Sequence, residues 1–179
     1  MTGDGAAVII AQTARLLLRP WMPGDDQAMI PIFGDAETMR YIGHGYQRGL
    51  TPEETRALVA RVSEQYQRTG VGIWPVVLKE TGEIAGECGL FPVADSDDVE
   101  IAYIFASSQR GKGYAYEAAS AVLEYAFDVL KLPRVVAFTH RDNARSIALI
   151  DRLGMRFDRV VRIFHADLMR YFKDAAVAR

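Results

Sequence analysis

The segment between residues 99 and 131 places a strand, a short glycine-containing turn and a long helix in immediate succession, and this order restricts the possible folds more than any other feature. The run VEIAYIFA is rich in β-branched and aromatic residues, and the turn QRGKGYA follows two serines. Beyond it the apolar residues recur with a helical period, at Ala115, Ala119, Val122, Ala126 and Val129. The residues placed to face water are Glu117, Glu124, Asp128 and Lys131. A strand that leads directly into an amphipathic helix predicts a sheet with this helix packed against one face.

Two further helices are expected in the N-terminal third of the chain. The segment ARLLLR is typical of a first strand, and the turn WMPGDD that follows contains Asp25 and Asp26, either of which is able to cap a helix through IPIF. The second helix begins at TPEE, where Thr51 and Glu54 have the spacing of a capping box and a proline takes the first helical position. This helix is expected to end at Gly70.

The centre and the C-terminal third are expected to be rich in strands. Two β-rich runs surround KETGE, whose Thr81-Gly82 pair is typical of a hairpin turn, and VEIAYIFA follows as a third strand. These three strands are predicted to form an antiparallel meander. A buried strand RVVAFTH, a short helix that Asp142 or Asn143 caps and Gly154 ends, and a last hairpin complete the chain. This order of elements predicts an α+β fold built on one mixed sheet.

The composition excludes several classes of protein. The formal net charge of −2, a pI of about 5.9 and the lack of a basic run argue against nucleic acid as a partner. With one cysteine, Cys88, the chain has no internal disulfide framework. It also contains no run of about 18 apolar residues, which is the length that would predict a membrane span. We therefore expect a cytoplasmic protein with no membrane partner. Its expected organisation is a flexible leader at 1–12, a single domain at 13–174 and a tail at 175–179.

The turn at residues 109–115 has the composition of a phosphate-binding loop but fits neither of two common phosphate motifs. A Walker A loop needs Ser or Thr after its lysine, and a dinucleotide-binding fingerprint needs a third glycine; neither accompanies Gly111, Lys112 and Gly113. Two glycines at a helix start still let a ligand approach the backbone, where free N–H groups and the helix dipole favour an anion. Arg110 and Lys112 would add positive charge at the rim. Taken alone, such a turn is structural more often than functional.

Spacing along the rest of the chain gives the turn its interpretation. Residues 110–115 fit the pattern [QR]-x-x-G-x-[GA], and some thirty residues later NARS opens a second helix that ends at LGM. In these motifs the chain resembles the GNAT acyltransferase superfamily, which binds acetyl-CoA. The segments RLLLRPWMPGDD, VEIAYIF, RGKGYAYEA and NARSIALIDRLGM look more closely like the subgroup that includes the bacterial ribosomal-protein N-terminal acetyltransferases. The resemblance covers about residues 13–172.

The resemblance implies a fold and a donor site. The fold would be a mixed, mostly antiparallel sheet of about seven strands, flanked by about four helices and splayed in the middle. The backbone of the turn would hold the CoA pyrophosphate, through Arg110, Gly111, Lys112, Gly113, Tyr114 and Ala115. The backbone of Ile104 and Phe105 would pair with the pantetheine arm, Asn143 would hydrogen-bond to that arm, and Ser146 would lie near the sulfur. Taken alone, Asn143 is better explained as a helix N-cap, and Ser146 as an exposed residue of a first helical turn.

Acetyl transfer to an amine needs a group that removes a proton, because a lysine-like amine has a pKa of about 10.4 and an α-amine one of about 7.7 to 8.0. Glu100 is the candidate base, directly or through a water, since in an extended strand it shares a face with Ile104 and many relatives carry Glu at this place. A carboxylate facing solvent is the alternative interpretation of Glu100, and Glu87 is a second candidate base. Many family members have a Tyr acid where this chain has Ile150, so Ser146 becomes the candidate contact for the departing sulfur.

Other distinctive residues are expected to have structural or surface roles. His44, His140 and His165 lack metal-ligand spacing, so no metal is expected, and Cys88 is predicted to be buried and inert. Three aromatic residues could line an acceptor pocket. These are Trp21, Trp74 and Tyr41. For Trp74 core packing is the better interpretation, whereas Tyr41 and the segment around it suit a substrate loop.

Two functions agree with the sequence. One is an N-acetyltransferase that moves an acetyl group from acetyl-CoA to a primary amine, either a protein N-terminal α-amine or a small molecule, by direct attack in a ternary complex. The other is a non-catalytic acyl-CoA-binding or sensing protein, which the missing Tyr at position 150 leaves open. Either function is compatible with a monomer or a homodimer.

Overall fold

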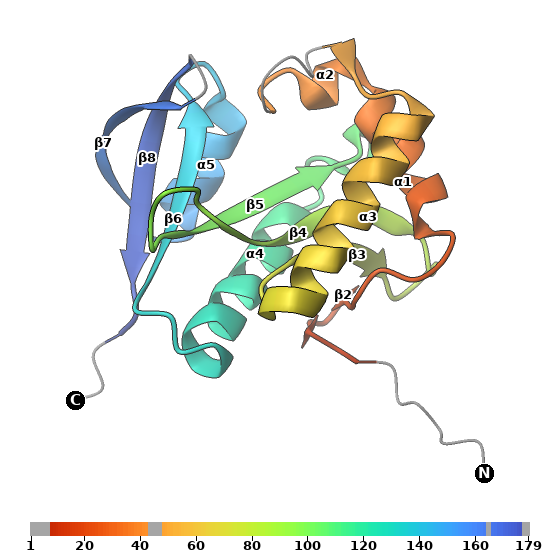
Figure 1. Ribbon diagram of the computed structural model, residues 1–179, viewed down its shortest axis with the longest axis horizontal. Coiled ribbons are helices and arrows are strands. Elements are labelled where there is room, and N and C mark those ends of the chain that lie inside the picture. The colour runs from red at the N-terminus through yellow and green to blue at the C-terminus, as the bar shows by residue number, and fades with distance from the viewer. Residues whose placement is uncertain (1–7, 43–47, 164–165, 177–179) are drawn as a thin grey trace.

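The computed structural model describes residues 8–42, 48–163 and 166–176, which form an open eight-stranded sheet with helices on both faces (Figure 1). The strands are β1 (Ala11–Gln12), β2 (Leu16–Leu18), β3 (Ile73–Leu78), β4 (Ile84–Pro92), β5 (Val99–Phe105), β6 (Arg134–His140), β7 (Arg156–Ile163) and β8 (Ala166–Asp174). The helices are α1 (Asp25–Gly34), α2 (Ala36–Met39), α3 (Pro52–Thr69), α4 (Tyr114–Glu124) and α5 (Ala144–Arg152). The strand order is β1-β2-β3-β4-β5-β6-β8-β7, and all neighbours are antiparallel except β5 and β6. The predicted α+β fold is confirmed.

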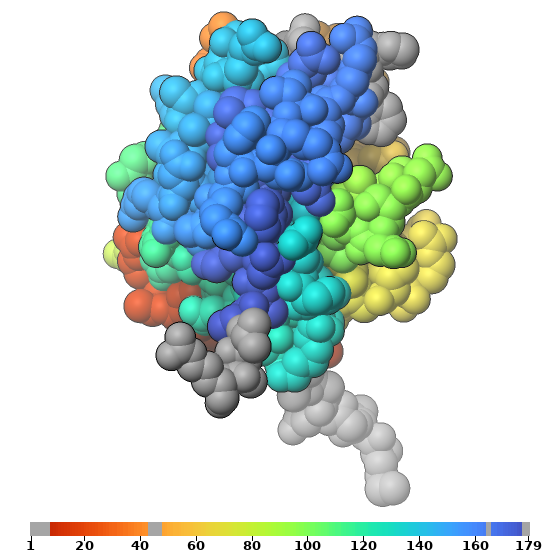
Figure 2. Space-filling view, turned by 90° about the vertical axis from the view of Figure 1, so that its left-hand side faces the viewer, coloured from red at the N-terminus to blue at the C-terminus, as the bar shows by residue number. Residues whose placement is uncertain are grey.

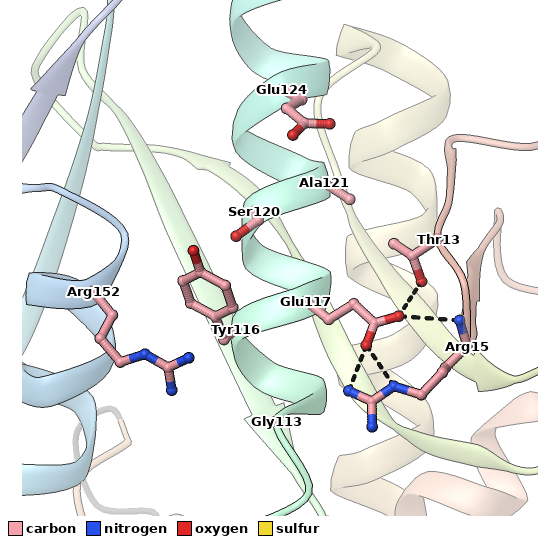
Figure 3. A pocket seen from close by; sticks show the side chains of 9 residues that line it. All are labelled: Thr13, Arg15, Gly113, Tyr116, Glu117, Ser120, Ala121, Glu124 and Arg152. Carbon is pink, nitrogen blue, oxygen red and sulfur yellow. Dashed lines mark hydrogen bonds and ion pairs between the residues drawn. The ribbon is translucent and has the colours of Figure 1, made fainter.

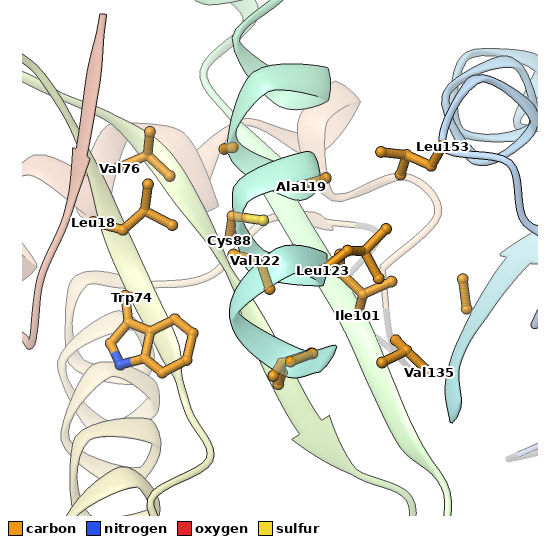
Figure 4. Packing of buried hydrophobic residues seen from close by; sticks show 14 of the residues in the cluster. Leu18, Trp74, Val76, Cys88, Ile101, Ala119, Val122, Leu123, Val135 and Leu153 are labelled. Carbon is orange, nitrogen blue, oxygen red and sulfur yellow. The ribbon is translucent and has the colours of Figure 1, made fainter. Parts of the chain in front are cut away.

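Helices α1 and α3 cover one face of the β3–β5 half of the sheet, and α4 covers the other face, with α5 beside it next to β6 (Figure 1). Figure 4 shows the core between α4 and the sheet, where Val122 packs among side chains of several strands. Trp74 of β3 is completely buried there, with its ring edge-on to Tyr66 and Tyr125 at centroid distances of 5.6 Å. Trp74 therefore has the packing role that its sequence context favoured.

The expected ends of α3 and α5 are confirmed by their caps. Thr51 Oγ1 accepts the N–H of Glu54 at 3.2 Å, and a Glu54 carboxylate oxygen accepts the N–H of Thr51 at 2.8 Å, which completes the capping box. Gly70 follows α3 with φ of 72°, in the left-handed region where glycine is favoured. Asn143, rather than Asp142, caps α5.

The N-terminal region differs from expectation in three places. Only Leu16–Leu18 of the segment 14–19 is strand, and Ala11–Gln12, expected in the leader, pairs with it as β1. Gly24 takes the N-cap position of α1, because the Asp25 carboxylate is held by Arg19 at 2.6 Å. Helix α2 was not expected; α2 and β1 are only four and two residues long, too short for periodicity to reveal. Residues 1–7 and 177–179 lie outside the described residues, and the domain boundaries remain predictions.

The end of the long helix also differs from expectation. After Glu124 the backbone makes a π-helical turn over Tyr125–Val129, which shifts the side chains away from the regular helical period. As a result Val129, expected on the apolar face, is 62% exposed. At the other end of the helix Glu117, expected to face water, accepts hydrogen bonds from Arg15 Nε at 2.7 Å and from the Arg15 backbone N–H at 3.1 Å. This ion pair joins α4 to the β1–β2 hairpin.

The sheet is splayed between β5 and β6, as expected. Glu100 and Val136 are the one residue pair that joins these strands within the described chain, and beyond it they separate (Figure 1). At the closed end of the splay the guanidinium of Arg170, a β8 residue only 6% exposed, forms ion pairs with Asp98 at 2.6 Å and with Asp158. Because Asp98 directly precedes β5, Arg170 joins the two halves of the sheet there. Figure 2 shows the C-terminal half from outside, where α5, β7 and β8 form the surface.

Candidate functional site

The open end of the splay is where the predicted site residues gather. The C-terminal end of β5 lies on one side of it, and β6 followed by the start of α5 lies on the other. Residues 106–113 then connect β5 to the start of α4. Beyond Glu100 the β5 edge that faces β6 has no strand partner in the described chain. The splay thus combines an unpaired strand edge with two helix N-termini.

The glycine turn presents the N-terminus of α4 without a side-chain cap. Gly111 and Gly113 have φ of 77° and 82°, both in the left-handed region, and Gly113 is the N-cap residue of α4. Because no side chain in the described chain caps α4, its first N–H groups remain available to a ligand. Uncapped N–H groups together with the helix dipole favour an anion at this position. Tyr114 and Ala115 follow as the first helical residues, both partly buried.

The two basic residues of the turn have separate positions. Lys112 is exposed, and its Nζ donates to the Gln109 side chain at 2.8 Å, so its charge lies at the rim of the turn. Arg110 is partly buried and its Nη2 donates to Thr38 Oγ1 at 2.8 Å. Thr38 belongs to α2 and itself donates to the Asp35 carboxylate at 2.6 Å. Arg110 therefore joins the turn to α2, an association with no signal in the local sequence.

Asn143 and Ser146 lie at the start of α5, across the splay from β5. Asn143 Oδ1 accepts the backbone N–H of Ser146 at 3.3 Å, so Asn143 is a helix cap, and this bond leaves the donor end of its amide for other contacts. The Ser146 hydroxyl lies 2.8 Å from the hydroxyl of Tyr103 on β5. Sequence reasoning did not single out Tyr103, because nothing local in the sequence indicates which helix a strand residue contacts.

Glu100 stands at the vertex of the splay. The registers Glu87↔Ile104 and Phe91↔Glu100 put Glu100 and Ile104 on the face that α1 and α3 cover, whereas Tyr103 and Phe105 lie on the α4 face. Glu100 is a partly buried residue, and its carboxylate accepts a hydrogen bond from the backbone N–H of Phe138. Burial raises the pKa of Glu100 to about 7, which the Phe138 bond partly offsets. A carboxyl group with this pKa can exchange a proton near neutral pH.

Glu87 and Cys88 lie deeper, on opposite faces of β4. Glu87 is only 5% exposed, one of its carboxylate oxygens has no hydrogen-bond partner in the described chain, and burial raises its pKa to about 8. Cys88 is completely buried and burial raises the pKa of its thiol, so the reactive thiolate form is disfavoured. The predicted burial of Cys88 is confirmed. Glu87 is less accessible than Glu100 and is therefore the weaker candidate base.

A pocket of about 430 Å³ opens between the β1–β2 hairpin, α4 and α5 (Figure 3). Glu117 and Arg15 form one wall through their ion pair, and Tyr116 and Arg152 form another, with the Arg152 guanidinium 4.4 Å from the Tyr116 ring centroid. Gly113 is the only predicted site residue that lines this pocket. The positive charges of the two arginines are balanced by Glu117 and Glu124, which also line it, so the pocket has no net attraction for an anion.

Tyr41 reaches from the end of α2 to the end of β6. Its ring stacks on His140 with a centroid distance of 5.7 Å, and its hydroxyl donates to the backbone carbonyl of Asp142 at 3.1 Å. His140 thus has a packing role, as expected. Trp21 is held at the edge of the α1–α3 layer by donation from its Nε1 to the Ile73 carbonyl at 2.8 Å. The other two histidines, at positions 44 and 165, lie outside the described residues, as does most of the expected substrate loop.

No helix in the described ranges is both long and apolar enough to cross a membrane.

Comparisons with known proteins agree with this fold. Residues 15–156 match the family model described as an acetyltransferase (GNAT) domain. The chain is 31% identical over 144 residues to an uncharacterized N-acetyltransferase, YnaD, from Bacillus subtilis, covering 80% of this chain and 81% of that protein. It is also similar to the crystal structure of a GNAT-family acetyltransferase from Bacillus anthracis, with 26% identity, a TM-score of 0.76 and coverage of 92% and 96%. A ribosomal L7/L12 alpha-N-protein acetyltransferase, RimL, in complex with coenzyme A, shares the fold with 19% identity, a TM-score of 0.79 and coverage of 94% and 98%.

Proposed function

The chain belongs to the GNAT acetyltransferase family, and we propose that it transfers an acetyl group from acetyl-CoA to a primary amine by direct attack in a ternary complex. The observation that carries this proposal is the splay itself, which combines an unpaired β5 edge, the uncapped N-terminus of α4 and a carboxyl group at its vertex, Glu100. The amine is a protein N-terminal α-amine or that of a small molecule.

The residues of the splay fit the chemistry of acetyl-CoA. Its pyrophosphate would bind to the backbone N–H groups of residues 110–115, since these groups have no side-chain cap and Lys112 supports the negative charge at the rim. The amides of the pantetheine arm would complete the free edge of β5 at Ile104 and Phe105 in the manner of an added strand. Because Phe105 is 7% exposed, only its backbone is suited to this contact. The Asn143 amide would donate to the same arm.

Glu100 would act as the general base. It takes a proton from the ammonium group directly or through a water, so that the neutral amine attacks the thioester carbonyl and the C–N bond forms. The C–S bond then breaks with its electron pair on sulfur, and the second proton that the nitrogen loses on becoming an amide passes to water. A free N–H of the β5 edge is suited to stabilise the oxyanion that develops between these events. Ser146 would donate a hydrogen bond to the departing sulfur. The Glu100 side chain lies on one face of β5, and the Tyr103 side chain with its Ser146 contact lies on the other. The amine and the leaving thiolate would therefore occupy opposite sides of the reacting carbon.

The amine that accepts the acetyl group is proposed from the relatives of this fold. The similarity to RimL, whose name gives it an α-amine of ribosomal L7/L12 as substrate, supports a protein N-terminus as the acceptor. This likeness lies below 20% identity and concerns the fold, so small-molecule amines remain in the same proposal.

A non-catalytic acyl-CoA-binding protein is the second candidate. Ile150 favours it, because it stands where many family members have a proton-donating Tyr and is completely buried among apolar residues of the core. Such a protein would bind acetyl-CoA and release no free thiol with any amine.

One experiment separates these candidates. The protein is incubated with acetyl-CoA and a panel of N-terminal peptides, polyamines and aminoglycosides, and the appearance of free thiol is measured. Acetyl transfer predicts thiol release that depends on one acceptor class. In parallel, acetyl-CoA at about 100 times its dissociation constant should stabilise the fold by about 2.7 kcal/mol. Binding without thiol release would favour the sensor, and the absence of any thermal shift would remove both candidates.

A further inference from the structure

The hydroxyl groups of Tyr103 and Ser146 form a contact that crosses the open part of the splay. Tyr103 lies three residues beyond Glu100, where β5 has already separated from β6, and Ser146 lies in the first turn of α5. Their oxygens are 2.8 Å apart and partly buried. The backbone of Ser146 is fixed from its own helix, since its N–H donates to Asn143 Oδ1. The Ser146 hydroxyl is therefore held from two directions, by Asn143 through the backbone and by Tyr103 through the side chain.

The chemistry of the two hydroxyl groups favours Tyr103 as the donor. A phenol is a stronger acid than an aliphatic alcohol, so a hydrogen bond between them is more stable when the phenol donates. Burial raises the pKa of Tyr103 to about 12, an effect that the Ser146 bond partly offsets, so the phenol keeps its proton at physiological pH. When Ser146 Oγ accepts this proton donor, the single hydrogen of the serine hydroxyl remains free for another acceptor.

We propose that Tyr103 is a positioning residue for acetyl transfer: by donating to Ser146 Oγ it turns the serine hydrogen toward the sulfur that leaves the acetyl group. This inference rests on the proposed function and on the role given there to Ser146. The C–S bond breaks with its electron pair on sulfur, and the serine hydrogen bonds to the thiolate. No proton needs to leave Tyr103 or Ser146, because a thiolate of CoA is a weak base, similar to a Cys thiolate with a pKa of about 8.5, and takes its proton from water after release.

The position of Tyr103 explains how the chain works with Ile150 in place of the Tyr acid of many family members. Residue 150 lies one helical turn further along α5 than Ser146 and is completely buried, so it contributes no polar group. Tyr103 supplies a phenol from the opposite wall of the splay instead, and it contacts the leaving group only through the serine.

A purely structural interpretation of the same contact predicts something different. If the bond only joins β5 to α5, its loss lowers the stability of the fold and raises the KM for acetyl-CoA, whereas kcat stays close to that of the wild type. If Tyr103 positions Ser146, its loss lowers kcat, leaves the KM for acetyl-CoA nearly unchanged and has no effect once Ser146 is absent.

The test uses Tyr103→Phe, which removes only the hydroxyl, with Ser146→Ala, the double variant and Tyr116→Phe as the matched control. Tyr116 lies on α4 with its ring against the Arg152 guanidinium, and the proposed function gives its hydroxyl no role (Figure 3). With the best acceptor from the amine panel, we expect Tyr103→Phe to lower kcat about tenfold, the loss of roughly one hydrogen bond in the transition state, with acetyl-CoA KM and melting temperature close to wild type. The double variant should have the kcat of Ser146→Ala, and Tyr116→Phe that of wild type.

Three outcomes would overturn the inference while acetyl transfer by the wild type stands. These are an unchanged kcat in Tyr103→Phe, an unchanged kcat in Ser146→Ala, or a loss in Tyr103→Phe that persists undiminished in the Ser146→Ala background. A wild-type protein that binds acetyl-CoA but acetylates no amine would instead refute the proposed function, and the role of Tyr103 with it.

Discussion

Glu100 on β5 and Val136 on β6 form the one residue pair between these parallel strands within the described chain, and the sheet opens immediately beyond it. The candidate base therefore stands at the point where backbone pairing stops and a ligand can begin to replace it. Its carboxylate uses the Phe138 N–H, a group of the diverging strand, as a hydrogen-bond donor. The position of Glu100 and the opening of the sheet thus have a common origin in the register of β5 and β6.

The pKa of about 7 for Glu100 gives a pH dependence with a definite sign. A general base acts when ionised, so its contribution to kcat/KM rises as pH increases through about 7 and levels off above it. Glu100→Gln should lower turnover about 10²-fold at neutral pH and abolish this part of the profile, while the dissociation constant for acetyl-CoA stays within about twofold. The measurements are pH–rate profiles with one acceptor and calorimetric binding of acetyl-CoA. Glu124→Gln, at an exposed position of α4, is the control, and unchanged turnover in Glu100→Gln would remove this residue as the base.

Gly111 and Gly70 make a matched pair for testing the glycine turn. Their φ values are 77° and 72°, and at neither position would an added Cβ meet an atom within 4 Å. Substitution by Ala should therefore lower the free energy of unfolding of each variant by a similar amount, about 1–2 kcal/mol, because Ala is strained in the left-handed conformation. Only Gly111→Ala should also weaken acetyl-CoA binding, by roughly three- to tenfold, because it displaces N–H groups proposed to hold the pyrophosphate. Urea denaturation and calorimetry measure the two effects, and equal acetyl-CoA affinities in the two variants would argue against the turn as the pyrophosphate site.

Asn143 combines an observed role with a proposed one, and conservative variants separate them. Asp and Ser are good helix caps, so Asn143→Asp and Asn143→Ser should keep the stability of the wild type, whereas Asn143→Ala should lose about 1 kcal/mol. All three lack the amide donor proposed to contact the pantetheine arm and should bind acetyl-CoA about tenfold more weakly. Asn143→Ser is the decisive case because it adds no charge. If it binds acetyl-CoA as tightly as the wild type, Asn143 is a cap and nothing more.

Local rules predicted those parts of the fold that neighbouring residues determine. The capping box at Thr51, the end of α3 at Gly70 and the Asn143 cap depend on contacts within a few residues, and the central meander follows from β-rich runs joined by short turns; each is present. The elements missed were β1 and α2, which have too few residues to show a period, and the π-helical turn after Glu124.

The site could be predicted only in part for the same reason. The order and spacing of its motifs predicted the glycine turn, Glu100 and the start of α5, because these are positions along the chain. Contacts between distant segments, such as Tyr103 with Ser146 and Arg110 with Thr38, depend on how strands and helices pack and have no signature in one sequence. The buried state of Glu87 belongs to the same class, since its strand neighbours Pro75 and Ile104 are distant in sequence.

Glu87 is expected to make stability depend on pH in a direction opposite to that of a paired carboxylate. Burial raises its pKa from 4.5 to about 8, so the folded state binds the proton more tightly than the unfolded state. The resulting stabilisation is complete below about pH 4.5 and is lost as pH rises through about 8. Glu87→Gln keeps the shape of the side chain but has no charge to bury. Its free energy of unfolding should therefore be close to that of wild type in acid and on the order of 5 kcal/mol higher above pH 8.

Urea denaturation of wild type and Glu87→Gln across this pH range measures the difference, with Glu80→Gln at an exposed position as the control. A difference that does not grow with pH would mean that Glu87 is ionised in the folded state near neutrality. The same variant also tests the choice between the two carboxylates. Because Glu87 is 5% exposed and Glu100 is more accessible, Glu87→Gln should retain most of the turnover that Glu100→Gln loses; the reverse result would transfer the role of base to β4.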